Sequence, residues 1–180
     1  MPLPKGYEWL GAIGPLPKVV REALALHGTK EFPGGADNPV IMGWAREITK
    51  EVEAAYGGDE IPWCGLFAAV VIHRAGYPVI SGPLWAANWA KFGAKSHQAG
   101  LGDILVFKRP GGGGHVGFYI AEDESAYHVL GGNQSDAVTI ARIAKTRCVA
   151  TRRPYFKIGQ PASVKPYQVK AGGKLSTNEA

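Results

Sequence analysis

The chain has 180 residues, of which 46% are apolar and 10% aromatic, so it is long enough to bury one sizeable core and too apolar to be disordered over most of its length. Only 19% of the residues are charged, and 25 glycines and 13 prolines favour a protein with many turns over a helical bundle. Residues 1–150 hold equal numbers of basic and acidic side chains, so the net charge of +5 comes from residues 151–180, and the domain lacks the basic face of a nucleic-acid-binding protein.

Helices are expected in the first half of the chain. Pro17 lies where the first helical residue is favoured, and Gly28 is typical of a helix end. Asn38 and the proline after it predict the start of a second helix with one apolar face. A third helix is apolar nearly all round, which predicts that it is buried. With their capping residues, the predicted helical segments are 17–28, 38–58, 62–76 and 84–92.

Short β-rich runs separated by turn residues fill the second half. The runs are 103–107, 115–121, 125–130, 137–141 and 147–152, and their spacing predicts an antiparallel meander. Helices first and strands after is the α+β pattern, in which N-terminal helices pack on an antiparallel sheet. We expect a lead-in with the first helix over 1–30, one domain over 31–154, and a basic, flexible tail over 155–180.

Cys64 is the first candidate for chemistry. It lies at or just inside the start of the third helix, where unpaired backbone amides and the helix dipole stabilise a thiolate, the reactive form. Cys148 lies in an alternating strand among apolar neighbours, which indicates a structural thiol. The two cysteines are far apart and form no C-x-x-C pair, so a cysteine metal site is excluded. One disulfide is conceivable, but we expect two free thiols in a chain made in a reducing compartment.

His115 is the second candidate. It follows four glycines and opens a strand, on one face of which His115, Gly117 and Tyr119 alternate. Gly117 leaves room beside the histidine for a partner to approach. A base that serves Cys64 needs this combination of a near-neutral pKa, a rigid strand and open space.

Asn133 is the third candidate, in a glycine-rich turn after the strand that is expected to pair with the His115 strand. Its side-chain oxygen could accept a hydrogen bond from the imidazole and fix the tautomer and the orientation of the ring. Asparagine is also common in such turns for backbone reasons alone. Gln134 and Asp136 are weaker choices for the same role.

The motifs IPWCGLF, GDILVF, GHVGFYI and GGNQ, in this order, resemble those of the CHAP and NlpC-type papain-like peptidoglycan hydrolases, especially a phage- and prophage-associated branch. The resemblance runs from about residue 31 to residue 154. It implies a papain-like fold with Cys64 as nucleophile, His115 as base and Asn133 as the orienting residue. The residue type that orients the histidine varies among these families, so the resemblance supports the role of Asn133 less than those of Cys64 and His115.

The resemblance further implies hydrolysis of an amide of the peptidoglycan stem, either between two amino acids or between muramic acid and L-Ala. Trp63 and Asp59, just upstream of the cysteine, are expected to line the substrate pocket, and Trp85 and Tyr119 to contribute aromatic surface. No cofactor is expected. No metal is expected either, because the chain lacks a calcium-loop run and residues 122–124 indicate a hairpin turn.

Peptidoglycan is the expected partner, and we expect a monomer with no nucleic-acid partner. Because the sequence has neither a secretory signal nor a run of about 18 apolar residues, we expect synthesis in the cytoplasm and no stable membrane insertion. Such a hydrolase would reach the wall through a holin-type pore or a secretion system. The sequence identifies no inhibitor and no export machinery. Two alternatives stay open: a Cys-dependent amidase or acyltransferase acting on another substrate, and a non-catalytic wall-binding or virion structural module that retains the fold.

Overall fold

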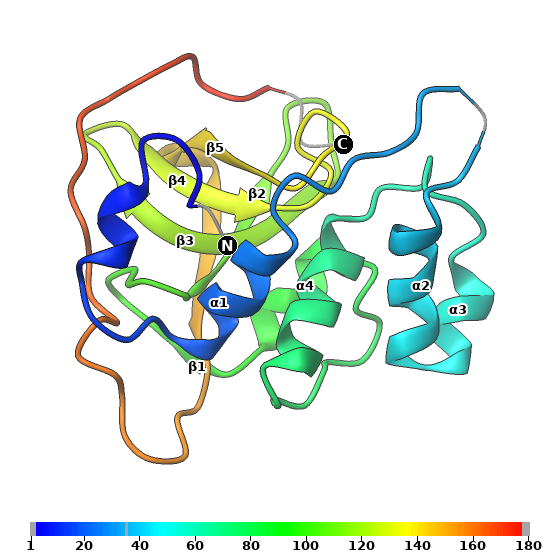
Figure 1. Cartoon of the computed structure of the whole chain (residues 1–180), viewed down its shortest axis with the longest axis horizontal. Coiled ribbons are helices and arrows are strands. Elements are labelled where there is room, and N and C mark those ends of the chain that lie inside the picture. The colour runs from blue at the N-terminus through cyan, green and yellow to red at the C-terminus, as the bar shows by residue number, and fades with distance from the viewer. Residues whose placement is uncertain (1–2, 35, 178–180) are drawn as a thin grey trace.

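The structure is a computed structural model that describes residues 3–34 and 36–177 (Figure 1). Most of its helices precede its strands along the chain, as the sequence predicts. The helices gather on one side of a six-stranded antiparallel sheet, so the predicted α+β class is confirmed. The helical elements are η1 (Glu8–Gly11), α1 (Lys18–Ala25), α2 (Pro39–Ile48), α3 (Lys50–Ala55), α4 (Cys64–Arg74) and η2 (Ala86–Lys91).

The second predicted helix is two helices, α2 and α3, because Thr49 interrupts the helical backbone between them. This residue has an extended backbone, with φ −158° and ψ 163°, and its hydroxyl accepts a hydrogen bond from the amide of Val52. Threonine is a preferred N-cap residue, so it starts α3 instead of continuing α2. Asn38 caps α2 in the same way, through the amide of Val40, as the sequence predicts.

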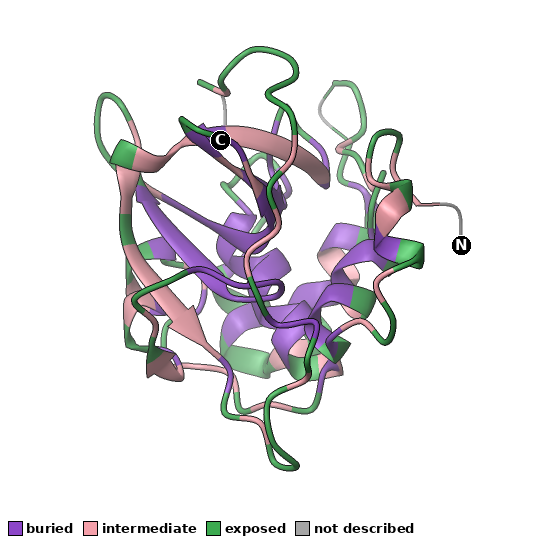
Figure 2. Ribbon diagram, turned by 90° about the vertical axis from the view of Figure 1, so that its left-hand side faces the viewer, coloured by how far each residue is buried: buried purple, intermediate pink, exposed green. Residues whose placement is uncertain are grey.

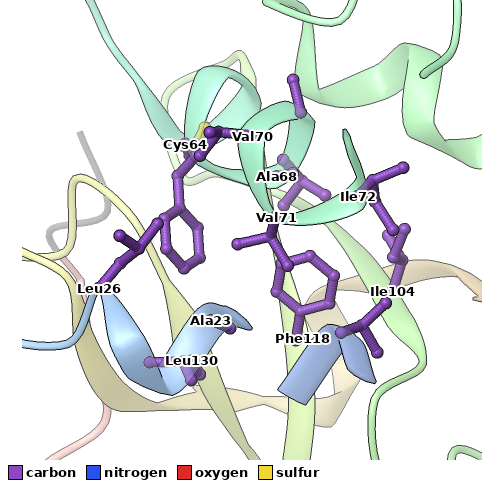
Figure 3. Close-up of a cluster of buried hydrophobic side chains, with 14 of the residues drawn as sticks. Ala23, Leu26, Cys64, Ala68, Val70, Val71, Ile72, Ile104, Phe118 and Leu130 are labelled. Carbon is purple, nitrogen blue, oxygen red and sulfur yellow. The ribbon is translucent and has the colours of Figure 1, made fainter. Parts of the chain in front are cut away.

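The third predicted helix, α4, is buried as expected. Every residue from Cys64 to Ile72 is shielded from solvent, and Figure 3 shows Cys64 in the buried cluster that α4 forms with α1 and the sheet. Aromatic rings extend this core toward α2, with Trp44 edge-on to Trp63 at 5.8 Å between ring centroids. Because each of the α4 residues from Cys64 to Ile72, and each of the two tryptophans, is at least nine-tenths buried, packing on all sides fixes the start of α4.

The sheet has the order β1-β6-β2-β3-β4-β5, so the predicted meander of β2 to β5 is present and β6 returns to pair with β2. β5 begins two residues later than predicted, because Ala137 forms a bridge with Lys30 before the strand starts. The short strand β1 was not predicted. The bounds are β1 (Ala94–Lys95), β2 (Ile104–Lys108), β3 (Gly114–Glu122), β4 (Ala126–Gly131), β5 (Thr139–Ala144) and β6 (Cys148–Arg153), with a short η3 (Lys145–Arg147) between the last two.

The two faces of the sheet bury different clusters. Val116, Phe118 and Ile120 of β3 belong to the main core with α1, α2 and α4, as their alternation predicts. Tyr119 belongs to a smaller cluster with Phe107 and other residues of the opposite face. Figure 2 shows the central strands β2, β3 and β4 as mostly buried, whereas β5 and β6 toward the edges are mostly intermediate.

The C-terminal segment, residues 155–177, is predicted to be flexible, but hydrogen bonds attach it to the sheet. The amide of Val169 donates to the carbonyl of Glu122, and the amide of Tyr167 donates to the hydroxyl of Tyr119 at 3.1 Å. The segment runs around the outer side of the molecule in Figure 1. The N-terminal thirty residues are likewise part of the main core, to which Leu10 and α1 contribute. The expected lead-in and tail therefore pack as parts of one body with residues 31–154.

A buried group of polar side chains, which we call the Asp123 cluster, ties both terminal segments to the sheet. Asp123 Oδ2 accepts hydrogen bonds from His128 Nε2 at 2.9 Å and Arg142 Nε at 2.7 Å. The Tyr7 hydroxyl lies 2.6 Å from His128 Nδ1, and Arg142 Nη1 donates to the carbonyl of Gly173. The cluster comprises Tyr7, Asp123, His128 and Arg142.

Cys64 and Cys148 are both free thiols, as predicted. Across residues 3–34 and 36–177, no helix combines the length and the apolar character needed to cross a bilayer.

Candidate active site

Cys64 is the first residue of α4, where the sequence predicts it. Trp63 precedes the helix as its N-cap and supplies no side-chain cap, so the first-turn amides keep their capacity to bind a negative group. A Cβ at Gly65 would collide with the backbone carbonyls of Pro83 and Leu84, so glycine lets that segment lie directly on the first turn.

The strand β3 brings its backbone to the Cys64 thiol. The backbone amide and carbonyl of Tyr119 form hydrogen bonds with the segment that leads into β2. In an antiparallel strand, the backbone groups of successive residues point to alternate neighbouring strands, so the amide of Val116, three residues earlier, points toward β4. Pairing between β3 and β4 reaches only Phe118 with Leu130, so Val116 lies beyond the last pair. There its amide is close enough to Cys64 to favour the thiolate. The thiol therefore lies beside the residue that follows His115.

Burial dominates the electrostatics of the thiol and raises the pKa of Cys64 above its ordinary value. Hydrogen bonds from the amides of Val116 and Gly65, and the positive charge of Arg109, act in the opposite direction and favour the thiolate. The surroundings of Cys64 thus contain groups that stabilise a thiolate, but in the closed structure burial outweighs them.

The hydrogen-bond partner of His115 is Gln134, not Asn133. His115 Nε2 lies 3.0 Å from Gln134 Oε1, and the amide nitrogen of Gln134 donates to the carbonyl oxygens of Thr139 at 2.6 Å and Val129 at 3.2 Å. These two acceptors fix which end of the Gln134 amide faces the ring. His115 therefore carries its proton on Nε2 when neutral.

Glycine at position 131 makes this contact possible. A Cβ there would lie 2.6 Å from Gln134 Oε1 and 3.0 Å from His115 Nε2, so any side chain would separate the two groups. Gly117 has a different role from the predicted one. The space beside it is filled by Val129 and the backbone of Leu130, so it serves close strand packing and leaves no opening next to His115.

Asn133 is buried, but its side-chain oxygen accepts no hydrogen bond within the described part of the chain. Its backbone has φ 54°, a left-handed conformation that asparagine tolerates better than most residues. The turn residue before it, Gly132, lies against Trp63 and Phe67. This backbone conformation is the one that makes asparagine common in such turns, and Asp136 is exposed in the same turn.

Three of the four residues expected to contact substrate are buried and have other partners. Trp63 donates from Nε1 to Glu31 at 2.6 Å, Asp59 accepts from the amide of Asn38 at 2.7 Å, and Tyr119 anchors the C-terminal segment. Trp85 differs, since it is 75% exposed and borders a groove of about 390 Å³. The groove is otherwise lined mainly by apolar residues of 48–55 and 79–84.

The candidate site is closed to solvent. Cys64 is 3% exposed, Gln134 1% and His115 0%. Residues 83–86 cover it, because Pro83 and Leu84 lie on the residue after Cys64, and Ala86 lies 3.3 Å from the Cβ position of the residue before His115. We call residues 83–86 the covering segment. This segment therefore lies against the first turn of α4 and the start of β3, where Cys64 and His115 are found.

A group of carboxylates near the start of α4 is the one cluster in the described residues with the spacing of a cation site. Asp37, Asp59 and Glu60 hold oxygens within 4.8 Å of one another. Asp59 and Asp37 already accept hydrogen bonds from the backbone amides of residues 38 and 59. These bonds explain the cluster as a structural junction between two loops.

No known protein family matches the chain, and neither a curated protein nor a solved structure shows significant similarity to it. The likeness to papain-like hydrolases therefore stays a prediction that rests on four short motifs.

Proposed function

We propose that the protein is a papain-like cysteine hydrolase that cleaves an amide of the peptidoglycan stem, as an endopeptidase or an N-acetylmuramoyl-L-alanine amidase. The observation that carries the proposal is the meeting of two elements at Cys64. The backbone amide of Val116, the residue after His115, favours the Cys64 thiolate, and the His115 ring contacts Gln134 through Nε2. A cysteine is activated when a base that a third group orients comes within reach of it, and the proposal assigns these roles to Cys64, His115 and Gln134.

The chemistry is two acyl transfers. Cys64 Sγ attacks the amide carbonyl carbon while its proton passes to His115 Nδ1. The backbone amide of Cys64, at the helix N-terminus, stabilises the negative oxygen of the tetrahedral intermediate. His115 then returns the proton to the leaving amine, and water hydrolyses the thioester with His115 as base. Gln134 keeps the imidazole in the tautomer that this sequence requires.

Access to the site is part of the proposal. In the closed structure the thiol is buried and its pKa is raised, so the enzyme is inactive until the covering segment, residues 83–86, swings away. Opening would hydrate the thiol and remove the cause of the raised pKa, while the amides of Val116 and Gly65 would still favour the thiolate.

The same burial favours a second candidate, a non-catalytic wall-binding or virion structural module. In such a module Cys64 and His115 would be core residues, and the covering segment would never open. The two candidates differ in whether Cys64 can be reached by a reagent in solution, because a thiol that is permanently buried reacts only when the protein unfolds.

Digestion of purified peptidoglycan, with the products identified by mass spectrometry, tests the proposal. We expect wild type to release new amine termini, Cys64→Ala to lose at least about 10³-fold in rate with a similar melting temperature, and Cys148→Ala to keep its activity. The identity of the new termini names the bond. Equal losses in both variants would contradict the role of Cys64. No cleavage, together with a Cys64 thiol inert to iodoacetamide, would establish the structural module.

A further inference from the structure

Arg109 lies at the turn of the β2–β3 hairpin, two residues beyond the partner of His115 in the strand register. In the hairpin register Phe107 pairs with His115, and the turn beyond is closed by the amide of Arg109 bonding to the carbonyl of Gly113. Paired residues share a face of a sheet, and so do residues two apart on one strand. Arg109 and Gly113 therefore follow Phe107 and His115 as the next pair on the same face.

The absence of a side chain at Gly113 fixes where the guanidinium of Arg109 lies. Its Nε and Cζ atoms lie 3.9 Å from the position that a Cβ of Gly113 would occupy. Gly113 and the two glycines before it have positive φ, and nothing lies within 4 Å of the Cβ positions of Gly111 and Gly112. The turn thus presents one long cationic side chain beside the histidine and is otherwise free of obstruction.

Arg109 forms no ion pair among the described residues. Within residues 3–34 and 36–177, ion pairs join several other arginines to carboxylates, including Arg74 with Glu47 and Arg153 with Asp103, but no carboxylate lies within 4.0 Å of the Arg109 guanidinium. Its field reaches Cys64, where it favours the thiolate. Arg109 is half-buried and pairs with no carboxylate in the described part of the chain, and its guanidinium has the planar pair of donors that binds a carboxylate bidentately.

We propose that Arg109 is a specificity-determining residue that binds a carboxylate of the substrate beside the scissile amide. The inference rests on the proposed function and narrows its substrates: the enzyme takes stem peptides with free carboxylates and discriminates against those in which the carboxylates are carboxamides. A carboxamide keeps the shape but loses the charge, so the guanidinium would be left facing a weaker acceptor.

Two preparations of purified muropeptides test the inference, one with free stem carboxylates and one converted to carboxamides with carbodiimide and ammonia. We expect wild type to prefer the carboxylate form in kcat/KM by at least about tenfold. Arg109→Gln should remove this preference by slowing only the carboxylate form, and Arg109→Lys should restore part of it. Lys108→Gln removes a charge of the same sign from the last residue of β2, which faces the other side of the sheet, and should leave the preference intact. A preference that persists in Arg109→Gln would overturn the inference.

Binding to the Cys64→Ala variant tests the inference apart from catalysis. Calorimetry should show tighter binding of the carboxylate preparation, and Cys64→Ala/Arg109→Gln should bind both preparations equally. If wild type cleaves neither preparation, the proposed hydrolase fails, yet an Arg109-dependent binding preference would still support the carboxylate site. Equal binding of both preparations to Cys64→Ala would overturn it.

Discussion

Two buried histidines on neighbouring strands have opposite surroundings. His128 on β4 uses both ring nitrogens, toward the carboxylate of Asp123 and the hydroxyl of Tyr7, and Arg142 balances the charge of Asp123. His115 on β3 has a neutral amide as the partner of Nε2 and directly precedes Val116, whose backbone amide favours the Cys64 thiolate. A carboxylate and an arginine make the first histidine part of a self-contained structural cluster. A neutral amide orients the second without adding charge, which leaves the ring suited to exchanging a proton.

The largest difference between the two sites should appear in kcat when the side-chain amide of Gln134 is removed. Gln134→Ala should reduce kcat on peptidoglycan by about 100-fold with little change in KM, because the imidazole loses the acceptor that fixes its tautomer. Circular dichroism should show a folded protein. A kcat within threefold of wild type would show that His115 needs no orientation by Gln134.

Gln134→Glu sharpens the same contrast by giving His115 the kind of partner that His128 has. A carboxylate facing Nε2 favours the imidazolium and raises the pKa of the histidine. The limb of the pH–rate profile that His115 governs should therefore move to higher pH. An unmoved profile would argue that His115 does not titrate in the reaction.

The Asp123 cluster should matter for stability and not for catalysis. Asp123→Asn leaves Arg142 and His128 without a charged partner, which should lower the free energy of unfolding by about 3 kcal/mol while kcat per folded molecule stays unchanged. The exposed pair of Glu47 and Arg74 is the control, and Glu47→Gln should cost less than about 1 kcal/mol in urea titrations. Equal costs in the two variants would contradict a special role for the cluster.

The pH dependence of stability follows from the same cluster. The hydrogen bond from Arg142, with those from His128 and the backbone, holds the pKa of Asp123 well below its ordinary value. A carboxyl whose pKa is lowered on folding stabilises the folded state fully above the unfolded pKa of about 3.9, and that contribution declines as the pH falls below it. Thermal melts of wild type should fall more steeply below pH 4 than those of Asp123→Asn. Parallel curves would contradict this assignment.

The sequence predicts the fold class and the placement of Cys64 and His115, because hydrophobic periodicity and turn residues define helix starts and strand starts. It does not identify the partner of His115, since Asn133 and Gln134 are adjacent and both are amides. The left-handed turn and the two carbonyl acceptors that aim Gln134 at the ring arise only when β4 and β5 pair. The covering segment and the docking of residues 155–177 depend on contacts between distant parts of the chain, which no local pattern specifies. Arg109 was missed because its position matters only through the hairpin register.

The smallest expected effect belongs to Asn133, the residue that the sequence places in the orienting role. Asn133→Gly and Asn133→Ala should both keep kcat within about twofold of wild type, because the asparagine oxygen accepts no hydrogen bond in the described residues and Gln134 holds the ring. Alanine should cost about 1 kcal/mol of stability at φ 54°, whereas glycine adopts that conformation without strain. Both variants lack the side-chain amide of Asn133, but only the alanine variant has a strained backbone. A change in kcat therefore reports a role of the amide in catalysis, whereas a difference in melting temperature between the two variants reports the backbone strain. A tenfold loss of kcat in both would return the orienting role to Asn133.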